Sequence, residues 1–212
     1  MPELSFESRF TNRFELRPFQ KRDVEPLYEA VMVSIPELSQ FLPWASRAYG
    51  RIDSTRFTRD SIRAFREQRA FDFAIRHRDE PRRHIGNVSI WFVSRGFRSG
   101  EVGYWVRSDE SRTGIATEVA ARMVQVGFEE LRMHRIILRI AVGNHPSERV
   151  AEKLGFTREG ILREELEVHG KWLDHTAYSL LEHEYAAKKE AIQALVGSTL
   201  SDLPREDSPI DG

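Results

Sequence analysis

The sequence predicts a mixed α/β (α+β) domain built on a single twisted, mixed sheet of about seven strands, with helices on both faces. Three patterns predict this class. Residues 71–76 and 85–91 alternate apolar and polar side chains, as strands with one buried face do. From Gly114 the apolar residues recur every three or four positions, which is typical of an amphipathic helix. Residues 136–142 are apolar on both faces, which predicts a central strand.

The N-terminal elements follow from local signals. Residues 14–18 alternate like a strand that ends at a proline. Residues 23–27 resemble a helix start, and a short helical stretch is expected near 37–42. Residues 52–54 offer an N-cap for a helix that runs to about Arg69. This helix carries a stripe of arginines, at Arg56, Arg59, Arg63 and Arg66. A solvated helix face explains the stripe, and a patch for an acidic partner is the alternative.

The remaining elements complete a strand–helix–strand pattern with a closing hairpin. A strand at 101–106, a helix from 114 to about 131 and the strand at 136–142 form a unit whose two strands should be parallel. The further elements expected are a helix at 146–154 and strands near 158–168 and 172–182. We assign residues 1–185 to one domain, and residues 186–212 to a C-terminal helix followed by a disordered tail.

The composition excludes several kinds of site. The 212 residues contain no cysteine, so disulfides, thiolate zinc sites, iron–sulfur ligation and a cysteine nucleophile are ruled out. None of the seven histidines stands in an HExxH or HxxxH arrangement, so we expect no metal site. No apolar run approaches the ~18–20 residues of a membrane span, and the N-terminus lacks a signal-peptide pattern. We therefore expect a cytoplasmic protein.

One candidate binding loop joins the strand at 101–106 to the helix that opens at Gly114. The first-turn N–H groups of a helix are unpaired and its dipole favours anions, so this junction could bind a phosphate. The glycine would let the phosphate approach the backbone closely. The stretch is neither a Walker loop nor a dinucleotide fingerprint, because the required lysine and glycines are missing. Alternatively, Thr113 is simply the helix N-cap.

A second candidate site follows the central strand. Asn144 and Ser147 lie at the carboxyl end of that strand, where open α/β sheets place their ligands. Ordinary capping of the short helix at 146–154 explains these two residues equally well.

Together the two stretches resemble the GNAT family of acyl-CoA-dependent N-acetyltransferases, over roughly residues 14–185. In that family an Arg/Gln-x-x-Gly-x-Gly/Ala loop holds the CoA pyrophosphate, and 111–116 match it with serine in the first position. Finer features resemble the RimJ/RimL-like ribosomal-protein N-acetyltransferase branch. They are Leu16-Arg17-Pro18 with Asp23, Phe41-Leu42-Pro43-Trp44, Gly103-Tyr104-Trp105, Gly114-Ile115-Ala116-Thr117-Glu118, Asn144 with Ser147, Glu152-Lys153-Leu154-Gly155-Phe156, Gly160, Gly170-Lys171-Trp172 and Asp174.

The resemblance implies that acetyl-CoA binds as co-substrate, with its pantetheine arm between the strands at 101–106 and 136–142. The amides of Trp105 and Val106 are expected nearest the thioester. The other implied cofactor-binding residues are Arg112, which stands in for the family's Arg/Gln, Thr113, Gly114, Ile115, Ala116, Thr117, Asn144 and Ser147.

Acetyl transfer to an amine needs a neutral nucleophile, an oxyanion donor and a proton for the leaving thiolate. Glu101 stands near the position of a glutamate that several family members use, and we expect it to be the base. Ser147 is implied as the proton donor, as in RimL-like members. Those members carry a glutamate where this chain has Leu166, but Glu164 should share its face. We expect Glu164 and Trp44 to bind the substrate.

The expected function is acetyl-CoA-dependent N-acetyltransfer to a primary amine, foremost a protein N-terminal α-amine of the ribosomal-protein type. Without cysteine, the transfer should be direct. The alternatives are a small-molecule acetyltransferase for an antibiotic or polyamine, and a catalytically silent acyl-CoA-binding regulatory module. A nucleic-acid binder is disfavoured because residues 101–212 carry a net charge of −6, against +5 for residues 1–100. No membrane partner is expected, and a homodimer is left open.

Overall fold

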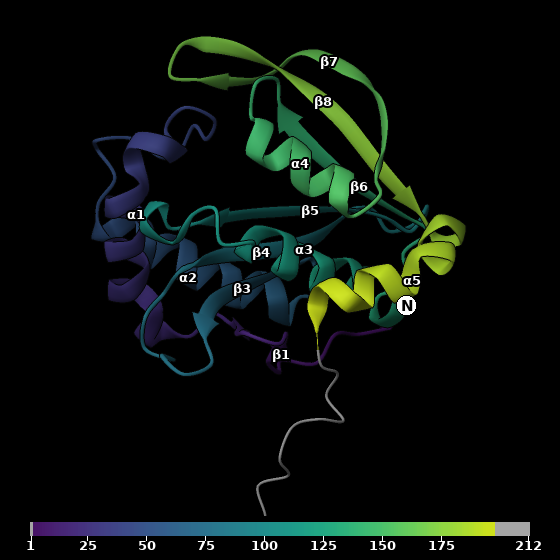
Figure 1. Ribbon diagram of the computed structural model, residues 1–212. Helices are drawn as coiled ribbons and strands as arrows, with labels where there is room; N and C mark the ends of the chain where they lie inside the picture. Colours follow the sequence, from purple (N-terminus) through teal and green to yellow (C-terminus); the bar gives the residue numbers. More distant parts are fainter. Residues whose placement is uncertain (1, 198–212) are drawn as a thin grey trace, which may run out of the picture.

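The computed structural model describes residues 2–197, which form one mixed sheet covered by helices on both faces (Figure 1). The sheet has eight strands in the order β1-β2-β3-β4-β5-β6-β8-β7. The strands are β1 (Arg9–Phe10), β2 (Phe14–Pro18), β3 (Ala70–His77), β4 (Gly86–Ser94), β5 (Ser99–Val106), β6 (Arg135–Ala141), β7 (Thr157–Val168) and β8 (Lys171–Leu181). The predicted fold class is confirmed, and the additional strand is the two-residue β1, which is too short to give a pattern.

The helices cover the two faces separately. On one face α1 and α2 enclose a small core that includes Phe19, Leu27 and Trp105. On the other face α3, α4 and α5 cover the main core, and α3 packs against both α4 and α5. The helices are α1 (Val24–Leu38), α2 (Arg51–Arg66), α3 (Ile115–Gln125) with a π-helical continuation at Val126–Glu130, α4 (His145–Lys153) and α5 (Glu182–Val196). No described helix is long and apolar enough to cross a membrane.

The bounds of two helices differ from the expectations. Helix α1 continues through Pro36 to Leu38, so no separate helix forms at 37–42. Helix α2 begins at Arg51 because Gly50 is its N-cap, and Asp53 accepts a hydrogen bond from the Gly50 N–H (2.9 Å) from inside the first turn. The side chain of Asp53 thus caps the helix from the N3 position.

The C-terminal helix belongs to the domain. Tyr185, Ile192 and Val196 of α5 are buried in the main core, and Tyr185 stacks on Phe128 with ring centroids 4.7 Å apart. The domain therefore extends beyond residue 185, where we expected it to end. The tail predicted beyond Gly197 lies outside the described residues.

The parallel strands β5 and β6 separate halfway along their length. Their pairing covers only three residue pairs, from Ser99↔Arg135 to Glu101↔Ile137. Beyond that point β5 stays paired with β4, while β6 stays paired with β8 as far as Ala141↔His175. The sheet is thus divided beyond Glu101, and this division positions the site described next.

Candidate active site

The gap between β5 and β6 exposes a row of backbone hydrogen-bonding groups. The Arg107 N–H donates to the Ile85 carbonyl (2.9 Å) beside β4, and in an antiparallel pair the direction alternates by residue. The backbone groups of Trp105 therefore point toward β4, whereas those of Tyr104 and Val106 face the gap. We expected both the Trp105 and the Val106 amides near the thioester. The geometry supports Val106 and corrects the expectation for Trp105, whose amide is directed into the sheet.

A cavity of about 390 Å³ lies along this gap. Its walls come from both separated strands, from the start of α4 and from the loop after α1. Its lining includes Trp44, Trp91, Glu101, Gly103, Tyr104, Arg139, Asn144, Ser147, Glu165 and Leu166.

The N-terminus of α3 carries the predicted phosphate loop. Gly114 is the N-cap, with φ +83°, a left-handed conformation that favours glycine, and Arg112 beside it also has a positive φ of 65°. The Thr113 hydroxyl instead donates to the Glu110 carbonyl (2.8 Å), so Thr113 is not the N-cap. The N–H groups of residues 115–117 begin the helix without intrahelical acceptors and are available to an anion.

The loop is tied to the N-terminal strands by one arginine. The Arg13 guanidinium donates to the Thr113 carbonyl (3.1 Å) and to the Glu118 carboxylate (2.7 Å). Glu118 is buried, and a second hydrogen bond reaches it from the Arg13 backbone N–H (3.1 Å). These contacts hold the loop from outside and leave the first-turn N–H groups of α3 unobstructed.

Asn144 and Ser147 cap a helix and also line a cavity, which are the two interpretations that the sequence left open. The Asn144 side chain caps α4 by accepting a hydrogen bond from the Ser147 N–H (3.4 Å). Both residues also line the cavity in the gap. Their capping role fixes the start of α4, which in turn fixes where the Ser147 hydroxyl lies.

Glu101 is buried, and its carboxylate is paired with an arginine. Arg139 donates from Nε to Oε1 (3.0 Å) and from Nη2 to Oε2 (2.7 Å), and it also binds Glu165 on β7. The hydrogen bonds that Arg139 donates to Glu101 raise the pKa of the guanidinium, so the arginine is always charged. Arg139 thus occupies both oxygens of the Glu101 carboxylate.

Tyr104 is a functional candidate that the sequence reasoning passed over. Its hydroxyl is buried and has no hydrogen-bond partner among the described residues. Burial raises the pKa of Tyr104 to about 12, and the nearby Ser147 hydroxyl moderates that rise. Helix α4 contains no tyrosine that could protonate a thiolate, but the fold brings Tyr104 of β5 close to Ser147 at the start of that helix. The Gly103-Tyr104-Trp105 stretch was the available signal.

Glu164 does not take the place expected for it. The pairing of β7 with β8 shifts between Leu162 and Leu166, and Glu164 lies in this bulge with φ +50°. The bulge breaks the strict alternation that would have put Glu164 on the face of Leu166. Glu165 and Leu166 line the cavity in the gap, whereas Glu164 is exposed and lines neither cavity described here.

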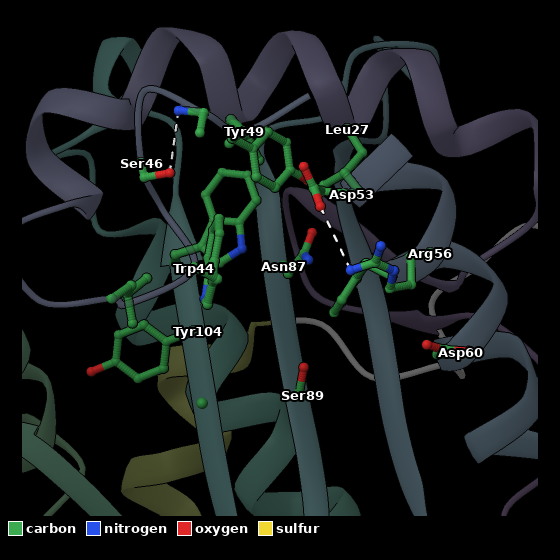
Figure 2. A pocket seen from close by; sticks show the side chains of 16 residues that line it. Leu27, Trp44, Ser46, Tyr49, Asp53, Arg56, Asp60, Asn87, Ser89 and Tyr104 are labelled. Atoms are coloured by element: carbon green, nitrogen blue, oxygen red, sulfur yellow. Dashed lines mark hydrogen bonds and ion pairs between the residues drawn. The ribbon is translucent and has the colours of Figure 1, made fainter. Parts of the chain in front are cut away.

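A second, larger cavity of about 690 Å³ lies between the sheet and helices α1 and α2 (Figure 2). It meets the cavity in the gap at four shared lining residues: Leu42, Trp44, Gly103 and Tyr104. Trp44 thus stands between the two cavities, with its ring 6.2 Å from that of Trp105 and 5.9 Å from that of Tyr49. Two ligands could reach each other at this junction.

An open helix N-terminus beside two parallel strands that separate halfway is the arrangement of acyl-CoA-dependent acyltransferases. Residues 13–157 match the family model described as the acetyltransferase (GNAT) domain. The chain belongs to this family, as its motifs predicted.

One relative is named as a ribosomal N-acetyltransferase, which agrees with the RimJ/RimL-like resemblance, and another is named for a polyamine substrate. The putative ribosomal N-acetyltransferase YdaF of Bacillus subtilis is 36% identical over 104 residues, which cover 49% of this chain and 57% of that protein. The spermidine N(1)-acetyltransferase of Vibrio cholerae is 28% identical over 112 residues, covering 53% of this chain and 65% of that protein. The matched part is therefore less than two thirds of either relative.

Solved structures share the fold over most of its length. The structure of Mycobacterium smegmatis RimJ in complex with CoA-disulfide has a TM-score of 0.71 and 26% identity. The comparison covers 86% of this chain and 94% of that one.

Proposed function

We propose that this protein is an acetyl-CoA-dependent N-acetyltransferase that acetylates a protein N-terminal α-amine. The observation that carries the proposal is the junction at Trp44, Gly103 and Tyr104. One cavity leads from the junction along the gap toward α4, and the other leads toward α1 and α2. A thioester in the first cavity and an amine in the second would meet there.

The chain offers groups for the pyrophosphate and for the pantetheine arm of acetyl-CoA. The first-turn N–H groups of α3 would hold the pyrophosphate, with Gly114 allowing close approach and Arg112 nearby. The backbone groups of Val106 and Tyr104 would pair with the pantetheine arm in the gap. Asn144 would set the position of α4 beside that arm.

The reaction then needs no covalent intermediate on the protein. The neutral amine nitrogen attacks the thioester carbon, the C–S bond breaks, and the leaving thiolate takes up a proton. Ser147 and Tyr104 supply the hydroxyl groups that would protonate the thiolate. Glu101 would accept the proton lost by the amine through a water molecule, since Arg139 occupies both carboxylate oxygens.

The ionisation of the acceptor amine favours an α-amine as the substrate. An α-amino group has a pKa of about 8, so a substantial fraction is neutral near physiological pH without help. A lysine-like amine with a pKa of about 10.4 is almost fully protonated at that pH and must lose a proton before it can attack. The spermidine-acetylating relative keeps a polyamine as the second candidate acceptor.

Calorimetry with acetyl-CoA, followed by measurement of thiol release across N-terminal peptides and small amines, tests the proposal. We expect saturable acetyl-CoA binding and thiol release that depends on the acceptor. Tight binding with no turnover on any amine would instead favour the catalytically silent module. That alternative rests on the departures at Ser111 and Leu166 from the family pattern.

Two further parts of the proposal concern assembly and location. The sequence left a homodimer open. Strand β7 is an outer strand of the sheet and exposes Ile161 and Leu162, so we propose it as the surface of a homodimer. Sedimentation of the wild type beside an Ile161→Lys variant tests this, and equal masses would contradict it. The cytoplasm is the proposed compartment, which fractionation of cells would check.

A further inference from the structure

We infer that the larger cavity selects acceptors with a large apolar group next to the amine, specifically peptide N-termini that begin with an aromatic or branched aliphatic residue. This inference rests on the proposed function and names the substrate class of the same site. Three features of the cavity support it: the apolar lining, the paired charges at the rim, and the fixed side-chain amide of Asn87.

The walls of the cavity are predominantly aromatic and aliphatic. They include Leu27, Val31, Trp44, Tyr49, Phe57 and Trp105. The volume of about 690 Å³ is in the range of sites that enclose most of a drug-sized ligand. An N-terminal serine or alanine would leave much of this apolar surface in contact with water, whereas a phenylalanine or leucine side chain would cover it.

The carboxylates of the cavity are already paired, which disfavours a polycationic acceptor. Asp53 accepts from the Gly50 N–H (2.9 Å) and lies 3.9 Å from Arg56, a pair visible in Figure 2. Asp60 lies 3.2 Å from Arg59 and 3.4 Å from an arginine one turn further along α2. An extended polyamine would find no unpaired carboxylate among these residues, and it would meet the arginine stripe instead.

Asn87 gives the cavity a fixed polar contact (Figure 2). Its side-chain oxygen lies 2.7 Å from Nε2 of His84, which is fully buried against Phe19 and Trp105. The Asn87 amide nitrogen donates to no described residue, so it can donate into the cavity. A peptide N-terminus offers a carbonyl two bonds from its α-amine nitrogen as the acceptor, and a simple amine offers none.

A matched peptide panel tests the inference with the full-length protein. Peptides that differ only in the first residue (Phe, Leu, Ala or Ser) and spermidine are compared by kcat/KM. One methylene in an apolar pocket changes selectivity by about 10-fold or more, so we expect at least about 10-fold preference for Phe or Leu over Ser. Equal or greater activity on Ser, Ala or spermidine would overturn the inference and leave the proposed N-acetyltransfer intact.

Two variants connect the preference to the cavity. Trp44→Ala should reduce the Phe-over-Ser ratio about tenfold, whereas Trp172→Ala should leave it unchanged, since Trp172 is exposed and lines neither cavity. Arg56→Gln frees Asp53 and should raise kcat/KM for spermidine relative to the Phe peptide. An unchanged ratio in Trp44→Ala would contradict the assignment of the cavity.

Binding separates failure of the inference from failure of the function. Trp44 and Trp105 in the wall report occupancy through their fluorescence, even without turnover. Titration with the Phe and Ser peptides in the presence of CoA should give at least about 10-fold tighter binding of the Phe peptide. Selective binding without any acetylation would overturn the proposed function and uphold the inference, and equal binding would overturn the inference.

Discussion

The two cavities that meet at Gly103 differ in the groups that they offer a ligand. The cavity in the gap uses backbone: separated strands, an open helix N-terminus and a cap at the start of α4. The larger cavity uses side chains, from Trp44 and Tyr49 to Trp105 and Asn87. A site made of backbone groups can bind the same ligand with many different side chains. A site made of side chains is specific to one sequence.

Glu101→Gln tests the chemistry at the junction and should have the largest effect. General base catalysis contributes about 10²- to 10⁴-fold, so we expect kcat to fall by that factor with little change in acetyl-CoA affinity. The matched control is Glu159→Gln, which removes a carboxylate paired with Arg135 outside both cavities. Full kcat in Glu101→Gln would mean that Glu101 only positions Arg139.

Gly103→Val should obstruct the junction between the two cavities. A Cβ at Gly103 would lie 3.2 Å from the Trp91 ring, so a larger side chain must displace that ring or fill the junction. We expect kcat/KM to fall about 100-fold, since a displacement near 1 Å can cost that much. Acetyl-CoA affinity should change far less. Gly160→Val is the control because its site has open space, and parallel losses in both variants would point to misfolding.

His84, which contacts Asn87 of the larger cavity, should make the free energy of unfolding depend on pH. Burial lowers the pKa of His84 from 6.5 to about 3, so between these pH values only the unfolded chain binds the proton. Acid should therefore cost the wild type about 1.4 kcal/mol of unfolding free energy per pH unit, or about 3 kcal/mol by pH 4.5. Urea unfolding at several pH values would show a shallower loss in His84→Gln. The exposed His183→Gln variant should keep the wild-type slope.

Gly114→Val should have the smallest effect, because the backbone site loses geometry but no side chain. At φ +83° a β-branched residue is strained by about 1–3 kcal/mol. We expect the acetyl-CoA Kd to rise about 10-fold, measured by calorimetry, while acceptor preference stays constant. Gly50→Val is the control, since this N-cap glycine of α2 has an ordinary φ of −136°. An unchanged Kd would mean that the N-terminus of α3 does not bind acetyl-CoA.

Much of the backbone site was predictable from sequence. A glycine before an amphipathic helix and an asparagine before a second helix predicted both loops, because caps and turns depend on neighbouring residues. The resemblance to a family then connected them. Strand alternation failed at Glu164, since a bulge is set by how β7 pairs with β8 and not by β7 alone.

The acceptor side was not predictable in the same way. Trp44, in the loop after α1, was expected to bind the substrate, but nothing in the sequence pointed to Asn87 on β4 or Tyr49 before α2, and no local pattern connects the three. Tyr104 was visible as part of a motif, but its place beside Ser147 depends on the separation of β5 from β6.

The amino-acid sequence by itself determined the fold class, the order of the elements, the glycine that opens α3 and the absence of any cysteine chemistry. Each of these follows from periodicity, capping or composition, which are local properties of the chain. Only the tertiary structure decided that β5 and β6 separate after Glu101, that Arg139 pairs with Glu101, and that an aromatic cavity opens at Gly103. These features arise from contacts between residues far apart in the sequence, where packing and pairing, not local preference, set the geometry.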